Sequence, residues 1–245
     1  MTFWSNLREI VHEFPYLTQS SAMFLLAVSL GLWFRRQAAL FTLCAALALA
    51  NMPLISLHEP AFWRPKLIFH WRGFSPEGAL WLVATAVTTW IMAAWWWADR
   101  LAWDLRWRPL ARRLLVVLAI TAATGAACLR IWPAPADIML ANLVAVGTSG
   151  VVLSLLAPQG LRFAVFGASG YLVYHTLDTA VFTGLWPSTR AYWNPAAQLS
   201  WQLGSVPGYE IVFAMVFGAV WPLTIAYLAD LKIVASQDIR EGRAT

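Results

Sequence analysis

The sequence predicts an all-α polytopic membrane protein in which seven transmembrane helices form one domain. Of its 245 residues, 60% are hydrophobic and only 12% are charged, about half the charged share of an ordinary soluble domain. The mean hydropathy is +0.61. Apolar runs of about 20 residues, the length that crosses a bilayer, recur along the chain. They lack the period-two alternation of half-buried strands.

The seven apolar runs are expected to be helices, because backbone polar groups inside a bilayer must be hydrogen-bonded within their own segment. The first run follows Arg8, Glu9 and Glu13 and precedes Arg35 and Arg36. A cleaved signal peptide would carry its positive charge first, so this run is interpreted as a reversed anchor. The predicted spans are 19–34, 38–57, 79–97, 112–132, 138–157, 161–186 and 209–230.

The Lys and Arg residues of the connecting segments predict the orientation in the membrane. Eleven of the 17 fall in one set of segments and six in the other, and cytoplasmic segments carry the excess. We expect an integral protein of the cytoplasmic or inner membrane, with its N-terminus outside and its C-terminus in the cytoplasm. The net charge of +5 reflects this bias and indicates no nucleic-acid partner. The predicted cytoplasmic set is Arg35, Arg36, Arg100, Arg106, Arg108, Arg112, Arg113, Arg162, Lys232, Arg240 and Arg243.

The order of the spans predicts two parallel three-helix repeats joined by a connector helix. Repeat one covers about 17–100, the connector about 112–132 and repeat two about 137–231, within a single transmembrane domain of residues 1–245. In each half, a long loop rich in Trp and Pro joins the second span to the third. Each loop ends at a glutamate, Glu77 or Glu210, at the outer start of the next span.

The outer half of the bundle holds the polar side chains that are hardest to explain as solvated helix ends. His175 and Asp178 lie inside the sixth span, and an acid at membrane depth is a functional candidate by default. Asp178 is alternatively a structural partner of His175 or Arg130. His58 and Glu59 form a further outer pair. A glutamate at a helix start is favoured by the helix dipole even without catalysis.

Two other patterns are interpreted as structural. Gly167-Ala168-Ser169-Gly170 is similar to the nucleophile motif of rhomboid proteases, but no histidine follows on a later helix to activate the serine. We interpret the motif as small residues at a helix contact. Cys44 and Cys128 lie inside apolar runs and are too few for a zinc site or a disulfide framework.

Two stretches near the glutamates carry a family resemblance. In repeat two, Trp201-Gln202-Leu203-Gly204-Ser205-Val206 leads to Glu210, and the upstream helix 171–186 bears Asp178. In repeat one, Pro76-Glu77 precedes an apolar run. These stretches resemble the membrane-integral lycopene cyclases of the fused two-repeat carotenoid cyclase type. Each repeat of that family carries Pro-x-Glu-Glu at the head of a helix.

The chain departs from the family pattern at both motifs. Gly78 and Ile211 stand where the second glutamate is expected, and the proline of the second motif is shifted. A looser resemblance is to the small seven-helix membrane terpene cyclases, in which Glu59 and either Glu210 or Asp230 would fill the two acidic places.

The resemblance implies a cyclase that converts the end of a lycopene-type carotene to a β-ring. Such a reaction protonates a terminal double bond, closes the ring through a carbocation and removes a proton, so it needs no redox cofactor and no metal. The two glutamates would be the principal acids, because burial favours a carboxyl that retains its proton. Asp178 and His175 would serve as base or proton relay. The predicted catalytic set is Glu77, Glu210, Asp178, His175, Glu59 and His58.

Aromatic side chains would line the substrate site. Trp stabilises a cation best, by about 2 kcal/mol or more when desolvated, and the chain has 16 of them. Many are equally explained as anchors at the membrane interface. The predicted substrate-binding residues are Trp63, Trp71, Trp81, Trp193, Trp201, Tyr209 and Tyr174.

The expected partners are a lipophilic isoprenoid substrate and membrane lipid, and a homo-oligomer or a biosynthetic partner protein is left open. Two alternatives to a carotene cyclase also remain open from the sequence. One is a cyclase of another prenyl or terpenoid substrate. The other is a transporter or assembly protein with an outward-facing polar site, which parallel repeats and a midplane acid would suit.

Overall fold

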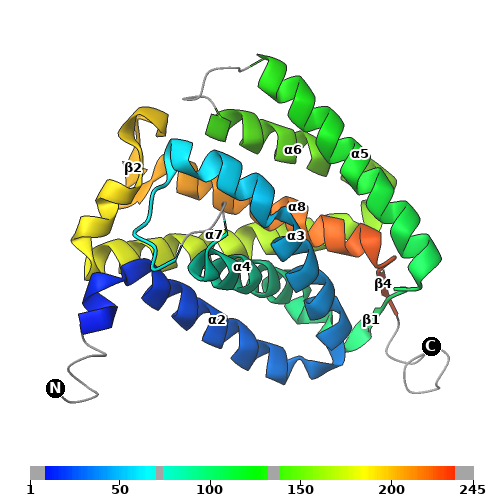
Figure 1. Cartoon of the computed structure of the whole chain (residues 1–245). Helices are drawn as coiled ribbons and strands as arrows, with labels where there is room; N and C mark the ends of the chain where they lie inside the picture. The colour runs from blue at the N-terminus through cyan, green and yellow to red at the C-terminus, as the bar shows by residue number, and fades with distance from the viewer. Residues whose placement is uncertain (1–8, 70–73, 132–137, 235–245) are drawn as a thin grey trace.

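The computed structural model describes residues 9–69, 74–131 and 138–234, and it leaves out the side chains of 53–62, 138 and 197. Within these ranges the chain is mostly helical, and each predicted apolar run overlaps a long helix (Figure 1). The long helices are α2 (Pro15–Trp33), α3 (Ala38–Phe62), α4 (Pro76–Ala94), α5 (Trp107–Ile131), α6 (Ile138–Leu156), α7 (Leu161–Leu185) and α8 (Gly208–Leu228).

Several of these helices have the length and composition of membrane spans. Among the described residues, five helical segments are long and apolar enough to cross a bilayer. The chain therefore has the character of a helical membrane protein, as its composition indicates. The five segments are Pro15–Trp33, Pro76–Arg100, Trp107–Ile131, Met139–Leu156 and Gly208–Leu228.

Local sequence determines where the helices begin, a few residues from the predicted ends. Ser75 is the N-cap of α4, and its hydroxyl accepts the Gly78 N–H at 2.9 Å. Pro76 takes the first helical position, where its missing N–H costs nothing. α4 consequently begins three residues before the predicted start at 79. α5 begins at Trp107 rather than at 112, because arginine is a good helix former and does not end a helix.

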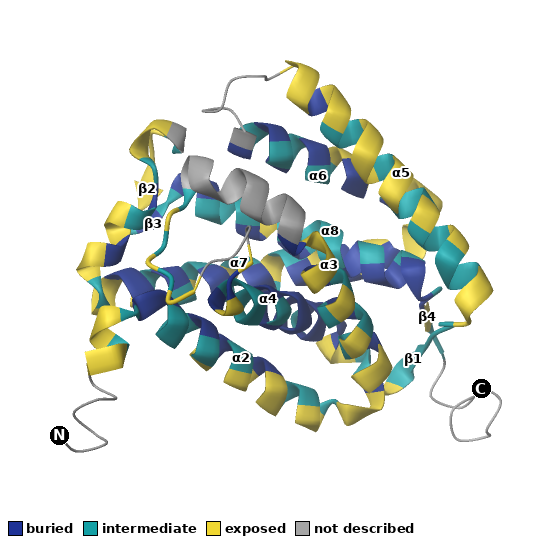
Figure 2. Ribbon diagram, in the orientation of Figure 1, coloured by how far each residue is buried: buried dark blue, intermediate teal, exposed yellow. Residues whose placement is uncertain are grey.

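α4 lies at the centre of the bundle. It packs against α2, α3 and α7, and 61% of its most apolar 18-residue stretch is buried. α5 lies on the outside against α6, and only 6% of its most apolar 18-residue stretch is buried (Figure 2). α8 packs against α6 and α7. In the core of α4, the fully buried Trp90 donates its indole N–H to the side-chain oxygen of Gln37 at 2.9 Å.

Glycines allow α7 and α8 to approach closely. A Cβ on Gly218 would lie 2.8 Å from the Gly167 carbonyl oxygen, and a Cβ on Gly167 would overlap the Gly218 carbonyl oxygen and the Pro222 ring. The predicted contact of small residues at Gly167 is therefore confirmed. This close approach sets the register between the two helices that carry His175 and Glu210.

Four two-residue strands depart from the predicted all-α fold. β1 (Leu101–Ala102) pairs antiparallel with β4 (Lys232–Ile233), and β2 (Gln202–Leu203) pairs antiparallel with β3 (Val206–Pro207). Such segments are too short for an alternating pattern. They form because the backbone polar groups of loops still need partners. The β1–β4 pair joins the segment after α4 to the segment after α8.

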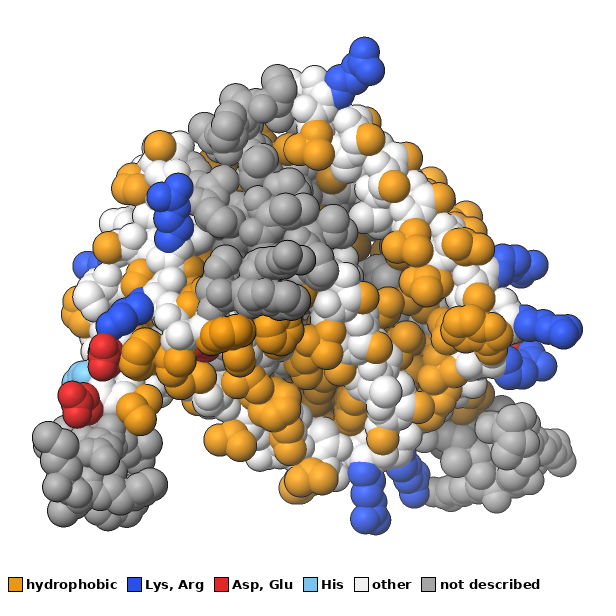
Figure 3. All heavy atoms as spheres, in the orientation of Figure 1, with side chains coloured by type: hydrophobic (Ala, Val, Ile, Leu, Met, Phe, Trp, Pro, Cys, Tyr) orange, Lys and Arg blue, Asp and Glu red, His pale blue; other side chains and the backbone are white. Residues whose placement is uncertain are grey.

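Charged groups surround the β1–β4 pair. The Asp104 N–H donates to the Ala229 carbonyl at 2.7 Å, and Arg113 pairs with Asp230 at 3.1 Å. Hydrogen bonds from the Arg106 side chain and backbone lower the pKa of Asp104 to about 2. Figure 3 shows basic side chains projecting near the start of α5 and the turn between α2 and α3, with hydrophobic side chains over the surface between them.

Candidate functional site

Three helices in mutual contact carry the central polar residues. Glu77 is the second residue of α4, Glu210 is the third residue of α8, and His175 lies in α7. α7 packs against both α4 and α8, and α4 also contacts α8. Glu210 of α8 and Trp81 of α4 both approach His175 of α7.

Glu210 is the centre of a buried hydrogen-bond network. Its Oε2 lies 2.8 Å from His175 Nε2, and its Oε1 accepts the indole N–H of Trp193 at 2.8 Å. The side chains of His175 and Glu210 are only 4% and 13% exposed. On the far side of the imidazole, the Tyr171 hydroxyl lies 3.3 Å from Nδ1. The structure thus brings together two predicted catalytic residues and one predicted aromatic residue.

This network can hold a proton in two arrangements. With an ionised Glu210, a protonated His175 donates from Nε2 to the carboxylate and from Nδ1 to the tyrosine oxygen. With a protonated Glu210, the carboxyl donates to Nε2, and Nδ1 donates to the tyrosine oxygen. Both arrangements keep the same two hydrogen bonds. A proton can therefore move between carboxyl and imidazole without rearrangement of the side chains.

Glu77 is the more deeply buried of the two glutamates, at 1% exposed. Its Oε1 accepts the backbone N–H of Ile68 at 2.7 Å, which fixes the carboxyl against the loop before α4. Among the described residues, its Oε2 has no hydrogen-bond partner. The position in the first turn of α4 also favours the ionised carboxylate through the helix dipole. One oxygen is thus anchored, and the other is buried without a partner among the described residues.

A pair of rings lies one helical turn beyond the two glutamates. Trp81 follows Glu77 by four residues and Phe213 follows Glu210 by three, so each ring lies on the face of its acid. The two rings stack at 6.3 Å between centroids, and Trp81 also meets the His175 ring edge-on at 6.4 Å. The ring pair therefore joins the helix that carries Glu77 to the helix that carries Glu210.

The stack of rings continues along α8. Phe213 stacks on Phe217, and Phe217 stacks on Trp221, both at 5.4 Å. Tyr171 approaches Phe217 at 5.6 Å, and the Trp221 indole donates to the Ala86 carbonyl at 3.0 Å. We call Trp81, Phe213, Phe217 and Trp221 the ring column. All four are half-buried, so part of each ring surface is accessible.

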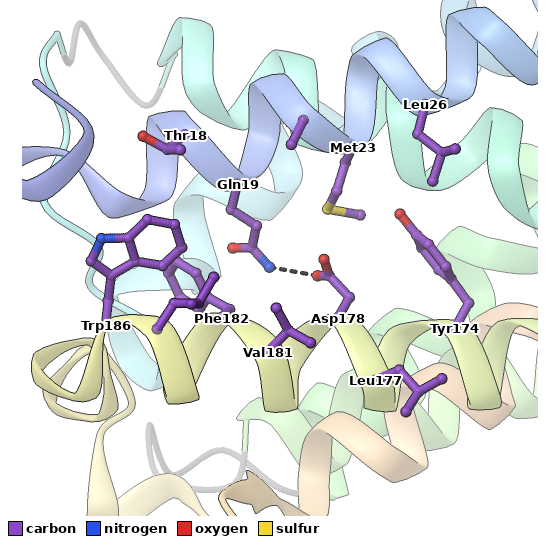
Figure 4. Close-up of a pocket in the computed structure, with 12 residues that line it drawn as sticks. Thr18, Gln19, Met23, Leu26, Tyr174, Leu177, Asp178, Val181, Phe182 and Trp186 are labelled. Atoms are coloured by element: carbon purple, nitrogen blue, oxygen red, sulfur yellow. Dashed lines mark hydrogen bonds between the residues drawn. The ribbon is translucent and has the colours of Figure 1, made fainter. Parts of the chain in front are cut away.

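Asp178 lies on another side of α7 from the network. It accepts a hydrogen bond from the side-chain amide of Gln19 on α2, and both residues line a groove between α2 and α7 (Figure 4). The structure thus gives Asp178 a partner different from His175 or Arg130, the two alternatives raised by the sequence. His175 and Asp178 are three residues apart, which turns their side chains about 60° from each other.

Aromatic residues of the loops before α4 and α8 pack together beside the network. The Trp63 ring contacts Trp193 at 4.4 Å, Tyr192 at 5.4 Å and Tyr16 at 5.8 Å. The backbones of Trp63 and Trp193 form an isolated bridge, and the Arg64 N–H donates to the Tyr192 carbonyl at 2.8 Å. Burial raises the pKa of Tyr192. These contacts join the loop before α4 to the loop before α8 at Trp193, the residue that donates to Glu210.

The remaining predicted aromatic residues lie elsewhere. Trp201 is 46% exposed and packs over Gly208 at the start of α8. Tyr209 is buried in a cluster with Met139 and Leu143 of α6. Tyr174 lines the groove between α2 and α7. The structure therefore does not gather these three rings beside the glutamates. Trp71 and the side chains of His58 and Glu59 lie outside the described residues.

Sequence reasoning missed five residues of this region: Tyr171, Gln19, Phe213, Phe217 and Trp221. A signal existed for some of them. Tyr171 precedes His175 by four residues, and Phe213, Phe217 and Trp221 recur at intervals of four, which places them on one helical face. Gln19 gives no such signal, because its contact with Asp178 depends on how α2 packs against α7.

Within the described ranges, no three His, Cys, Asp or Glu side chains gather as a metal would require. Cys44 and Cys128 are both buried and free. Comparison with known proteins finds no protein-family model, curated protein or solved structure that matches this chain.

Proposed function

We propose that this chain is a membrane-embedded cyclase that closes the end of a long isoprenoid, converting a lycopene-type carotene to a β-ring product. The observation that carries the proposal is a buried carboxyl–imidazole–hydroxyl network in contact with a column of aromatic rings. The resemblance to membrane-integral lycopene cyclases at both glutamates supports the choice of substrate. A cyclase of another prenyl or terpenoid substrate would use the same chemistry.

In the proposed reaction, Glu77 donates a proton to a terminal carbon–carbon double bond of the substrate. The resulting cation is attacked by a neighbouring double bond, which forms the new ring carbon–carbon bond. The Glu210–His175 pair then accepts a proton from the ring carbon next to the cation, and that electron pair becomes the product double bond. One proton enters and one leaves, so the reaction is a net isomerisation. The unpartnered Oε2 of Glu77 and the proton arrangements of the Glu210 network support these roles.

The ring column supports the cationic step. An aromatic face stabilises a desolvated cation by about 2 kcal/mol or more. Trp81 and Phe213 lie one turn from the two acids, and the column runs on through Phe217 and Trp221. A polyene lying along these rings would place its end group near the glutamates. The apolar surroundings would also exclude water, which would quench the cation.

The proposal includes the finer architecture expected from the sequence: seven transmembrane helices in two parallel three-helix repeats, joined by α5. In the first half α4 packs against both α2 and α3, and in the second α8 packs against both α6 and α7. This equivalent packing supports the repeat. The basic residues around the β1–β4 pair support a cytoplasmic C-terminus and an external N-terminus.

The test of this function is expression in a host that accumulates lycopene, followed by chromatographic analysis of its pigments. The proposal expects ring-containing products with the wild-type chain. Unchanged lycopene in a host that contains the folded protein would contradict the carotene substrate. Glu77→Gln and Glu210→Gln should each abolish the product, with Glu9→Gln as a matched control outside the network.

One observation favours a transporter as the second candidate. Parallel repeats are a recurrent architecture of secondary transporters, and a buried His–Glu pair is suited to proton coupling. Under this alternative, vesicles containing the protein would take up a solute in response to a proton gradient. Solute uptake that is lost in His175→Ala, together with absence of any cyclised product, would replace the cyclase by the transporter.

A further inference from the structure

The groove between α2 and α7 has features of a ligand site that the proposed cyclisation does not use. It has a volume of about 360 Å³. Its floor includes the buried Met23 and Phe182, and its rim includes the exposed Leu26, Leu177 and Val181. An exposed apolar rim on a membrane helix faces lipid, so a ligand can enter this groove sideways from the bilayer.

A hydrogen-bonded polar pair lies among the mostly apolar walls, which also carry the hydroxyls of Thr18 and Tyr174. Asp178 and Gln19 point toward each other across the groove and are hydrogen-bonded, with the Tyr174 side chain one turn further along α7 (Figure 4). Gln19 uses one amide N–H for Asp178, and its amide has a second N–H and a carbonyl oxygen. The pair therefore offers both donors and acceptors to a ligand, in a mostly apolar setting.

The dimensions of the groove indicate one extended chain. Tyr174 and Trp186 mark its ends on α7, and their 12-residue separation corresponds to about 18 Å of helix. The hydrocarbon of one leaflet is about 15 Å thick, half of the full core. Asp178 lies eight residues from Trp186, about 12 Å along the helix. A phospholipid would place acyl carbons at that depth and would give the second N–H and the carbonyl of the Gln19 amide no partner.

We propose that this groove binds a linear lipid alcohol, whose hydroxyl is hydrogen-bonded to Asp178 and Gln19 and whose chain lies along the apolar walls. A hydroxyl both donates and accepts, which matches this pair, whereas an ammonium group only donates. A hydrocarbon would likewise give the second N–H and the carbonyl of the Gln19 amide no partner. The proposal concerns a site separate from the Glu210 network, and it holds or fails independently of the cyclase.

The test measures binding of three probes to the purified protein by native mass spectrometry. The probes are geranylgeraniol, its hydrocarbon analogue without the hydroxyl, and its primary amine analogue. The alcohol should bind about tenfold more tightly than the hydrocarbon, as two net hydrogen bonds would give. It should also bind at least as tightly as the amine. Equal binding of alcohol and hydrocarbon, or tighter binding of the amine, would overturn the proposal.

Variants place the binding in the groove. In the double variant Gln19→Leu/Asp178→Leu, apolar side chains of similar size replace the pair, so the preference for the alcohol should disappear while chain binding remains. Ala22→Phe, on the groove wall, should weaken both ligands at least tenfold. Val173→Leu, on the exposed face of α7 outside the groove, should change neither. Undiminished alcohol binding by Ala22→Phe would overturn the proposal even if the double variant does not fold.

Discussion

Replacing Glu210 by glutamine separates the chemistry of the network from its structural role. The carboxyl contacts Trp193 and His175 at 2.8 Å each. A glutamine has nearly the same shape. Its carbonyl oxygen can accept from the indole, and its amide can donate to the imidazole nitrogen. We therefore expect a loss of only about 1 kcal/mol in the free energy of unfolding. Cyclised product should fall by about 10²–10⁴-fold, the usual contribution of a general acid or base.

Glu210→Ala is the matched comparison, because it removes both contacts. It leaves the indole N–H and the imidazole Nε2 without partners at a site where the His175 side chain is 4% exposed. Each unsatisfied group costs about 1–3 kcal/mol, so the free energy of unfolding should fall by about 2–6 kcal/mol. Thermal midpoints in detergent, followed by size-exclusion retention after heating, would measure the difference between the two variants.

Two results would refute this reasoning. Wild-type product formation by Glu210→Gln would show that the reaction does not use the proton of this carboxyl. An alanine variant as stable as the glutamine variant would show that the two buried hydrogen bonds do not form.

Three further predictions concern single contacts. Trp193→Phe keeps an aromatic ring but removes the N–H donor to Glu210, so the free energy of unfolding should drop by about 1–2 kcal/mol. An unchanged thermal midpoint would contradict this hydrogen bond. Gly167→Ala should destabilise the protein by about 1–3 kcal/mol through overpacking, whereas Gly125→Ala, with open space around it, should be neutral or stabilising by up to about 1 kcal/mol. The opposite order would refute the close helix contact. Asp104 should titrate in the folded protein near a pKa of about 2, so the stability that it contributes is present above its unfolded pKa of about 3.9 and is lost as pH falls through 2. In Arg106→Gln, the pKa of Asp104 measured by NMR titration should rise toward the unfolded value. An unchanged pKa would show that the Arg106 side chain does not lower it.

The long helices could be predicted because bilayer thickness imposes a length on any apolar run that crosses it. Their ends could not be predicted to the residue, because capping depends on local chemistry. Ser75 and Pro76 start α4 before its apolar run begins, and the arginines after Trp107 lie inside α5. The β1–β4 pair gives no signal at all, since two-residue strands are too short for a pattern.

The members of the candidate site could be selected from the sequence more readily than their partners. Acids and a histidine within apolar runs are conspicuous, which is why Glu210 and His175 were among the predicted residues. Their contact with each other depends on the close packing of α7 against α8 at Gly167. Likewise, the contact between Asp178 on α7 and Gln19 on α2 depends on how these two helices pack.

The central claim is that a proton enters the substrate and a different proton leaves it, through carboxyl groups that exchange with water. Turnover of lycopene by the membrane-embedded protein in D₂O measures this directly. Each ring closed should add one deuterium to carbon, so that the product is one mass unit heavier per ring. A cyclised product without deuterium would contradict the account.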